Sequence, residues 1–160
     1  MKKIFYSIIL FVLVGMSVAV GVSGEVAISV TTDGVVPYGR MAVSTTINTY
    51  TLGDIQTVKN TGDLPEKFRI KGRDSANWTL ENAIGTNQYV HGFCVYTAAG
   101  DCDNNPGPND YIPLSTEYTV LSDNVNSQSE VSFHLQITTP DINTTTTEQQ
   151  VNVTILAEAK

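Results

Sequence analysis

The 160-residue chain has few of the residues on which catalysis and metal binding usually depend. It holds two histidines, two cysteines and one tryptophan. We find no nucleophile-elbow, zinc-protease or phosphate-binding glycine motif, and no nucleophile stands beside His91 or His134 in the sequence. His134 also falls at a polar position of an alternating segment, where we expect it to face solvent. These absences argue against an enzyme and predict no bound cofactor.

Basic residues are scarce as well. The chain has 9 Lys+Arg against 16 Asp+Glu, which gives a formal net charge of −7. Without Lys2 and Lys3, seven basic residues face the 16 acidic ones and the net charge becomes −9. An acidic chain repels nucleic acids and anionic membrane surfaces, and we expect no nucleic acid as a partner.

Long apolar runs are confined to the N-terminus. Two lysines precede the apolar run at residues 4–14, and small residues follow it as far as Gly24. This order is typical of a secretory signal peptide helix, and the run is shorter than the roughly 20 apolar residues of a membrane span. We predict a signal peptide over residues 1–24, cleaved after Gly24 or, alternatively, after Ala19. The mature chain is then secreted or extracytoplasmic, at the cell surface or in the periplasm; an uncleaved segment would instead anchor it in a membrane.

Amphipathic helix patterns are missing from residues 25–160, where the dominant period is two. Val131, Phe133, Leu135 and Ile137, for example, alternate with polar residues. We expect strands over residues 26–31, 41–47, 54–59, 66–71, 77–80, 89–96, 118–121, 131–137 and 151–155. Turn signals separate them, which predicts an all-β fold: one two-sheet antiparallel β-sandwich of about seven to nine strands. Its first and last strands are candidates for pairing with the sheet edge of a neighbour.

Residues 85–116 interrupt this pattern as a loop insertion rich in proline and glycine. The insertion contains the only two cysteines, Cys94 and Cys102, which we expect to form a disulfide in an exported chain. Closing so short a loop would stabilise the fold by about 2–3 kcal/mol. A loop of this length in a compact domain is commonly functional, so the insertion is a candidate binding site.

Several side chains of the insertion carry oxygen atoms that could bind Ca²⁺. Asp101, Asp103 and Asn105 imitate the first ligands of a calcium loop, because Ca²⁺ prefers several oxygen ligands. The imitation then fails, since Pro106 stands at the glycine position and Ile112 at the position of the bidentate glutamate. A polar loop without metal is therefore the first interpretation, and Ca²⁺ is the alternative.

Aromatic residues are the other candidate ligands of the insertion. Exposed tyrosines could stack on sugar rings, which would make a carbohydrate or cell-wall glycan the ligand; half-buried strand tyrosines are the structural alternative. The tyrosines concerned are Tyr89, Tyr96, Tyr111 and Tyr118.

Four basic residues stand at every second position of one expected strand. They are Lys67, Arg69, Lys71 and Arg73. If the strand continues to Arg73, all four project from one face, roughly 7 Å apart along it. This basic stripe is a candidate contact for an acidic partner: another copy of the chain, a teichoic or uronic polymer, or anionic lipid. Its alternative role is a solvated outer face or a protected edge strand, since charged edges discourage unwanted pairing.

Three segments together are similar to a known module. "VPYGRMAVSTT", "VKNTGDLPEKFRI…NWTL" and the final "SEVSFHLQITTPDINTTTTEQQVNVTILAEA" resemble, in this order, the Ig-like domains of the Hydin-like (ASH) type found in bacterial and archaeal surface proteins. The resemblance covers most of residues 36–159 apart from the insertion. It implies an Ig-like sandwich with a structural or adhesive role. We expect Gly62 to adopt a positive φ in the "NTG" turn, and Trp78 to be a core residue between the sheets.

The sequence therefore predicts an exported, non-catalytic surface protein with a structural or adhesive role. It could be a self-assembling subunit of a filament or coat, with copies of itself or other surface proteins as partners. The alternative is a monomeric extracellular binding module that uses residues 85–116 to hold a carbohydrate or Ca²⁺.

Overall fold

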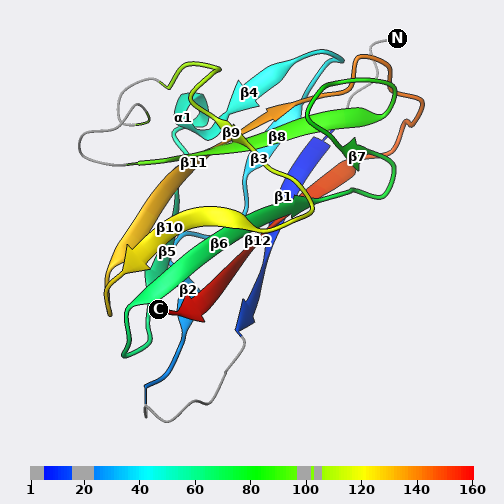
Figure 1. Cartoon of the computed structure of the whole chain (residues 1–160). Helices are drawn as coiled ribbons and strands as arrows, with labels where there is room; N and C mark the ends of the chain where they lie inside the picture. Colours follow the sequence, from blue (N-terminus) through cyan, green and yellow to red (C-terminus); the bar gives the residue numbers. More distant parts are fainter. Residues whose placement is uncertain (1–5, 16–23, 97–101, 103–105) are drawn as a thin grey trace.

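The computed structural model describes residues 6–15, 24–96, 102 and 106–160, and these form two packed β-sheets with almost no helix (Figure 1). The five-stranded sheet has the order β10, β6, β12, β1, β3. Its strands are β10 (Thr119–Val125), β6 (Glu66–Arg73), β12 (Gln149–Ala159), β1 (Tyr6–Gly15) and β3 (Pro37–Arg40). The predicted all-β sandwich is confirmed.

The seven-stranded sheet has the order β2, β5, β11, β8, β7, and two short strands pair beside this path. The five are β2 (Ile28–Val30), β5 (Gln56–Asn60), β11 (Glu130–Thr138), β8 (Gln88–Val95) and β7 (Thr79–Leu80); the other two are β4 (Thr46–Asn48) and β9 (Ile112–Pro113). One helical turn, α1 (Thr49–Leu52), follows β4. The sheets contain more strands than the predicted seven to nine. Strands of two to four residues are too short to show a recognisable alternation of apolar and polar residues.

Alternating apolar residues supply the core between the sheets. On β6, Phe68 and Ile70 are fully buried while the basic residues between them are half-buried. Val153 and Ile155 of β12 and Phe133 of β11 belong to the same buried cluster. Side chains of a strand point alternately to opposite faces, so the two-residue period of the sequence becomes one buried and one wet face. Burial of each large side chain contributes roughly 1.5–3 kcal/mol.

Strand β3 lies before the expected strand over residues 41–47, and within that range only Thr46 and Ile47 are in a strand, β4. Pro37 opens β3 and Gly39 adopts a φ of 70°. Proline lacks an N–H and is tolerated where a strand lies at the edge of its sheet, and β3 is the last strand of the five-stranded sheet. Because proline and glycine are both rare in strands, the sequence pattern did not indicate a strand at Pro37 and Gly39.

The "NTG" turn is held by a buried asparagine rather than by a positive φ. Asn60 is fully buried; its Nδ2 donates to the carbonyls of Leu64 and Val125 at 2.7 and 2.9 Å, and its Oδ1 accepts from the N–H of Gly62 at 2.8 Å. Gly62 is not among the positive-φ residues, so that expectation is wrong. A Cβ at Gly62 would overlap the carbonyl oxygen of Glu25, and close approach of two backbones is the reason for the glycine.

Candidate functional site

Strand β1 is the most unusual element of the fold. It lies between β12 and β3, so it is an interior strand, and it runs parallel to β12 (Figure 1). Nine residues pair with β12, from Ser7 opposite Gln149 to Gly15 opposite Ala157. These residues fall within the predicted signal peptide, and removal of that segment by a peptidase stays a prediction. The same residues fit both a signal peptide and a β-strand, because isoleucine, valine and aromatic residues are common in strands and in apolar signal segments.

The position vacated by β1 after processing would be a seat for another strand. We define the β1 seat as the edge of β12 over residues 149–157 together with β3. In the full chain the end strand β12 is not the free edge that the sequence suggested, because β1 and β6 flank it. Its core-facing residues, Val151, Val153 and Ile155, are at most 1% exposed. On the far side β1 pairs with β3 over only Tyr6 to Ile8, so most of the seat is bounded by β12 alone.

The first residues after the predicted cleavage site are tied to the "NTG" turn. The carbonyl of Glu25 accepts from Asp63 N–H at 3.0 Å, and that of Ala27 accepts from Thr61 N–H at 2.8 Å. The Ala27 N–H donates to Oε1 of Glu66 at 2.8 Å. Glu66 is fully buried, and burial raises the pKa of its carboxyl group, while the bond from Ala27 opposes the rise. We call this set of contacts the N-terminal clamp.

The basic stripe lies on one face of β6, as the alternation predicted, and its members have partners within the chain. Lys67 Nζ lies 2.8 Å from Oδ1 of Asp123, and Arg69 Nε lies 2.7 Å from Oε2 of Glu158. Lys71 Nζ stands 4.3 Å above the ring of Tyr118, a cation–π contact. Arg73, at the end of β6, is exposed. Intramolecular pairing of these charges reduces what the stripe offers to an acidic partner.

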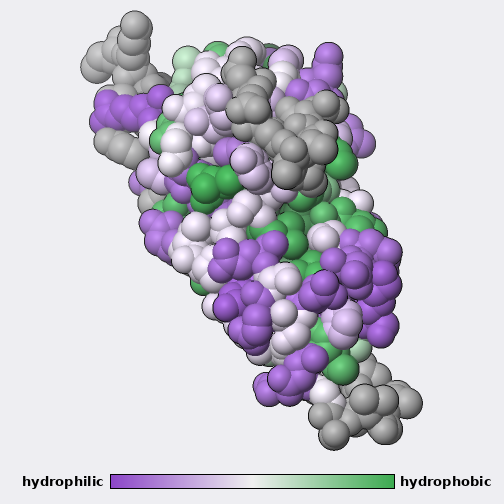
Figure 2. Space-filling model, turned by 90° about the vertical axis from the view of Figure 1, so that its left-hand side faces the viewer, coloured by the Kyte–Doolittle hydropathy of each residue, from purple (hydrophilic) through white to green (hydrophobic). Residues whose placement is uncertain are grey.

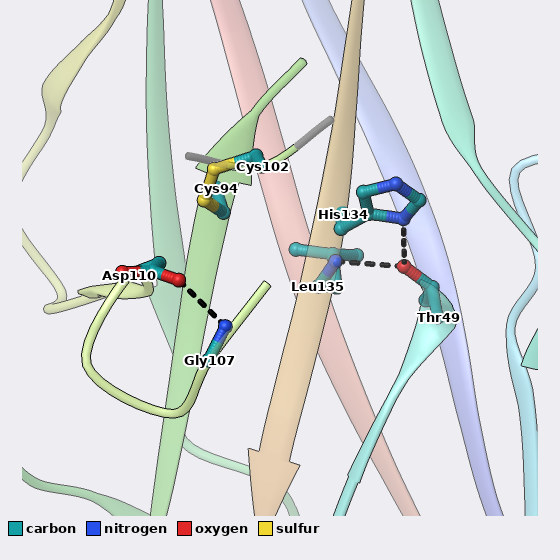
Figure 3. The surroundings of a disulfide bond; sticks show 7 residues. All are labelled: Thr49, Cys94, Cys102, Gly107, Asp110, His134 and Leu135. Carbon is teal, nitrogen blue, oxygen red and sulfur yellow. Dashed lines mark hydrogen bonds between the residues drawn. A yellow bond between two sulfur atoms is a disulfide. The ribbon is translucent and has the colours of Figure 1, made fainter. Parts of the chain in front are cut away.

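The predicted disulfide between Cys94 and Cys102 is formed (Figure 3). Cys94 lies on β8 and both cysteines are buried, together with Tyr111. Nearby, the carboxylate of Asp110 accepts a hydrogen bond from the N–H of Gly107 at 2.6 Å and closes a tight turn. The disulfide thus fastens one end of the insertion to the seven-stranded sheet.

The three residues of the calcium interpretation, Asp101, Asp103 and Asn105, lie outside the described residues. Within the described part of the chain, no group of three or more His, Cys, Asp or Glu side chains is arranged to hold a metal ion. The nearby Asp110 uses one carboxylate oxygen within its own turn.

The tyrosines considered for sugar stacking differ in accessibility. Tyr89 is fully buried and its hydroxyl donates to the carbonyl of Arg73 at 2.6 Å. Tyr111 is 7% exposed, and burial raises its pKa to about 12. The ring of Tyr118 is covered by Lys71. Of the four tyrosines, this leaves Tyr96, which is 46% exposed, as the one whose ring is accessible to a ligand. A single exposed ring is a weak basis for a sugar site.

Trp78 lies in the main core cluster and is 3% exposed. Its ring centroid is 6.0 Å from that of Tyr89, and its Nε1 donates to Oδ1 of Asn143 at 3.3 Å. The indole therefore packs by its apolar body and satisfies its one donor, as a buried tryptophan requires.

The two histidines are buried, so the expectation that His134 faces solvent is wrong. Helix α1 covers it: Thr49 Oγ1 lies 3.2 Å from His134 Nδ1 and accepts from the N–H of Leu135 at 2.9 Å (Figure 3). The ring of Tyr50 packs edge-on against it. Burial lowers the pKa of His134. The alternation placed the side chain on the outer face correctly, but no strand pattern could reveal a helical turn on that face.

His91 occupies the interior of the sandwich on β8. It is fully buried, its Nε2 lies 3.3 Å from the hydroxyl of Tyr38, and its Nδ1 has no hydrogen-bond partner. Burial lowers the pKa of His91 to about 3, so the ring is neutral at ordinary pH. Its neighbours are tyrosines whose own pKa values are raised by burial, Tyr38 and Tyr89. None of these groups is a nucleophile activated for catalysis.

Exposed apolar residues are dispersed over the described surface. On the face shown in Figure 2, green apolar surface is broken into separate patches by purple and white polar surface. The large exposed apolar side chains are Val43, Tyr50, Leu52, Tyr96, Ile112, Val120 and Ile142. Single exposed apolar residues are ordinary on protein surfaces, so the β1 seat is a stronger candidate contact than any of them.

No protein-family model matches the chain, and no curated protein is significantly similar to it. The resemblance to Hydin-like domains therefore stays a prediction. Among the described residues, no helix is long and apolar enough to cross a membrane.

Proposed function

We propose that this protein is an exported, non-catalytic structural or adhesive component of a surface assembly. Its processed form would join neighbours by strand addition at the β1 seat. The observation that carries the proposal is the position of β1, an interior strand formed by residues that the sequence assigns to a signal peptide. A central strand that export removes leaves the sheet incomplete until a neighbour supplies another.

The consequence of processing follows from the pairing. With β1 gone, the backbone N–H and C=O groups that β12 directs towards it have no partner, and the buried face around Val153 and Ile155 is uncovered. Unpaired edges of this kind are templates for strands of other chains, and strand addition is an established mode of recognition. The Cys94–Cys102 disulfide agrees with an oxidising, extracytoplasmic location.

The experiment compares one chain in two compartments. Exported by a host, residues 1–24 would be removed; retained in an oxidising cytoplasm, the same chain would keep them. N-terminal sequencing establishes the processing site, and size-exclusion with light scattering across concentration gives the mass. We expect the retained chain to be monomeric, because β1 fills its own seat, and the processed chain to associate. Equal masses for the two forms, or a processed monomer at every concentration, would refute the proposal.

A further inference from the structure

The β1 seat has a definite length and direction, which restrict what can fill it; this inference rests on the proposed function. The strand that fills it in the full chain pairs with nine residues of β12 and runs parallel to it. The register places residues 9, 11 and 13 opposite Val151, Val153 and Ile155, all buried, and residues 8 and 10 opposite Gln150 and Asn152, which are exposed and half-buried. Directly paired residues of neighbouring strands lie on the same face of a sheet.

The chain's own N-terminal strand is a poor candidate for this seat. After processing, Glu25 to Val30 would be the first segment able to move, and the N-terminal clamp holds its beginning through bonds to Thr61, Asp63 and Glu66. Strand β2 adds pairing with β5 over Ile28 to Val30. The clamp and the sheet therefore keep this segment in its own copy, and every other described strand is already within a sheet.

We infer that the seat receives an extended strand from a different protein of the assembly. The strand has about nine residues, runs parallel to β12, and carries large aliphatic or aromatic residues at the alternate positions that correspond to 9, 11 and 13. Its other positions accept polar residues, since they lie opposite polar residues of β12: the exposed Gln150, the half-buried Asn152 and the buried Thr154. In the absence of this strand, processed copies associate through the open edge of β12.

The test uses the full chain, with a protease site placed between β1 and Gly24 so that β1 can be released after folding. The cut protein is mixed with isotope-labelled peptides that contain residues 1–15, and mass spectrometry measures exchange into the seat. One peptide carries Ile8→Asn, Leu10→Asn and Val12→Asn. The matched peptide carries the same number of asparagines at the alternate face, Ile9→Asn, Phe11→Asn and Leu13→Asn.

We expect the peptide with asparagine at positions 8, 10 and 12 to exchange. The peptide with asparagine at positions 9, 11 and 13 should bind on the order of 100-fold more weakly or worse, because these positions pair with the buried residues Val151, Val153 and Ile155 of β12. Equal uptake of the two peptides, or uptake of neither, would overturn the inference. Added to associated processed protein, the first peptide should also lower the mass to that of a one-to-one complex, and an unchanged mass counts against the inference.

Cysteine pairs test the direction and the identity of the strand. In a chain with Gln150→Cys, a short bifunctional thiol reagent should capture a peptide with Ile8→Cys, its partner in the parallel register, and not one with Val14→Cys. The reverse result means an antiparallel strand and refutes the inference. In processed copies, Ser29→Cys should crosslink to Lys59→Cys within one chain, its partner across β2 and β5. Capture of Ser29→Cys by Asn152→Cys of another copy would show that a second copy donates β2.

These readouts separate the two proposals. If processed chains associate but take up neither peptide, the surface-assembly function stands and the inferred strand is wrong. If processed chains stay monomeric yet take up the correct peptide, the seat is real and the assembly function fails.

Discussion

The buried imidazole of His91 should make the stability of this protein depend on pH between neutrality and pH 5. The ring is fully buried, with the Tyr38 hydroxyl 3.3 Å from Nε2 and no hydrogen-bond partner for Nδ1. Burial lowers the pKa of His91 to about 3, against about 6.5 for a histidine in an unfolded chain. Below pH 6.5 the unfolded state therefore binds a proton that the folded state does not, and the free energy of unfolding falls as the pH falls.

The size of the effect follows from proton linkage. Each pH unit below 6.5 costs up to about 1.4 kcal/mol for one proton, so lowering the pH from 7 to 5 should remove about 2 kcal/mol of stability through His91 alone. At pH 5 the folded ring is still neutral, because its pKa lies about two units lower. The loss continues as the pH approaches 3 and ends there, when the folded protein takes up the proton as well.

Urea unfolding of the full chain at pH 7 and pH 5, for wild type and His91→Gln, measures this contribution. Glutamine is similar in size and keeps a polar group near Tyr38, but it does not titrate. Other groups whose pKa is shifted by burial, such as Glu66 and His134, affect the two proteins alike. We expect wild type to lose about 2 kcal/mol more than the variant between the two pH values. Equal losses would refute the assignment of a neutral, buried His91, whatever the absolute stability of the variant.

Three further predictions concern the fold and the stripe. Cys94→Ser with Cys102→Ser should lower the free energy of unfolding by about 2–3 kcal/mol, measured against wild type with and without reductant. Gly62→Ala should cost about 1–3 kcal/mol, because its Cβ would collide with the Glu25 carbonyl, and hydrogen exchange should show residues 25–27 released from the clamp. Reversing the charges of Lys67 and Arg69 should change stability little, because the carboxylate partner of each is exposed, and should leave the association of the processed chain intact. Loss of association in that last variant would assign the contact to the stripe.

Much of the sandwich could be predicted because its strands obey one physical rule throughout. Residues of β6, β11 and β12 alternate between core and surface, and the buried members, among them Phe68 and Phe133, are the ones that the period of two identifies. The disulfide was predictable from two cysteines in a chain with the sequence pattern of an exported protein. These features depend on residues that are close together in the sequence or on composition, and both can be read from one sequence.

Features that depend on distant parts of the chain could not be predicted in the same way. His134 is buried by a helical turn, α1, whose four residues are too few to give a helical period. The glycine at position 62 is required by the carbonyl of Glu25, a residue 37 positions away in the sequence, and not by its own backbone angle. The bond from the Ala27 N–H to Glu66 joins residues 39 positions apart in the sequence, so the strand pattern around Glu66 could not reveal it.

The N-terminal segment shows why one composition can serve two requirements in turn. An apolar run of isoleucine, valine, leucine and phenylalanine satisfies the signal-peptide pattern, and the same residues complete a sheet whose next strand, β12, buries Val151, Val153 and Ile155. Under the proposed function, the precursor would be closed and inert because it fills its own seat, and cleavage would open the seat only after export. The N-terminal clamp would then have a function: by bonding Glu25 and Ala27 to the "NTG" turn and to Glu66, it would hold the new N-terminus in place, so that this segment would not itself pair with the edge of β12.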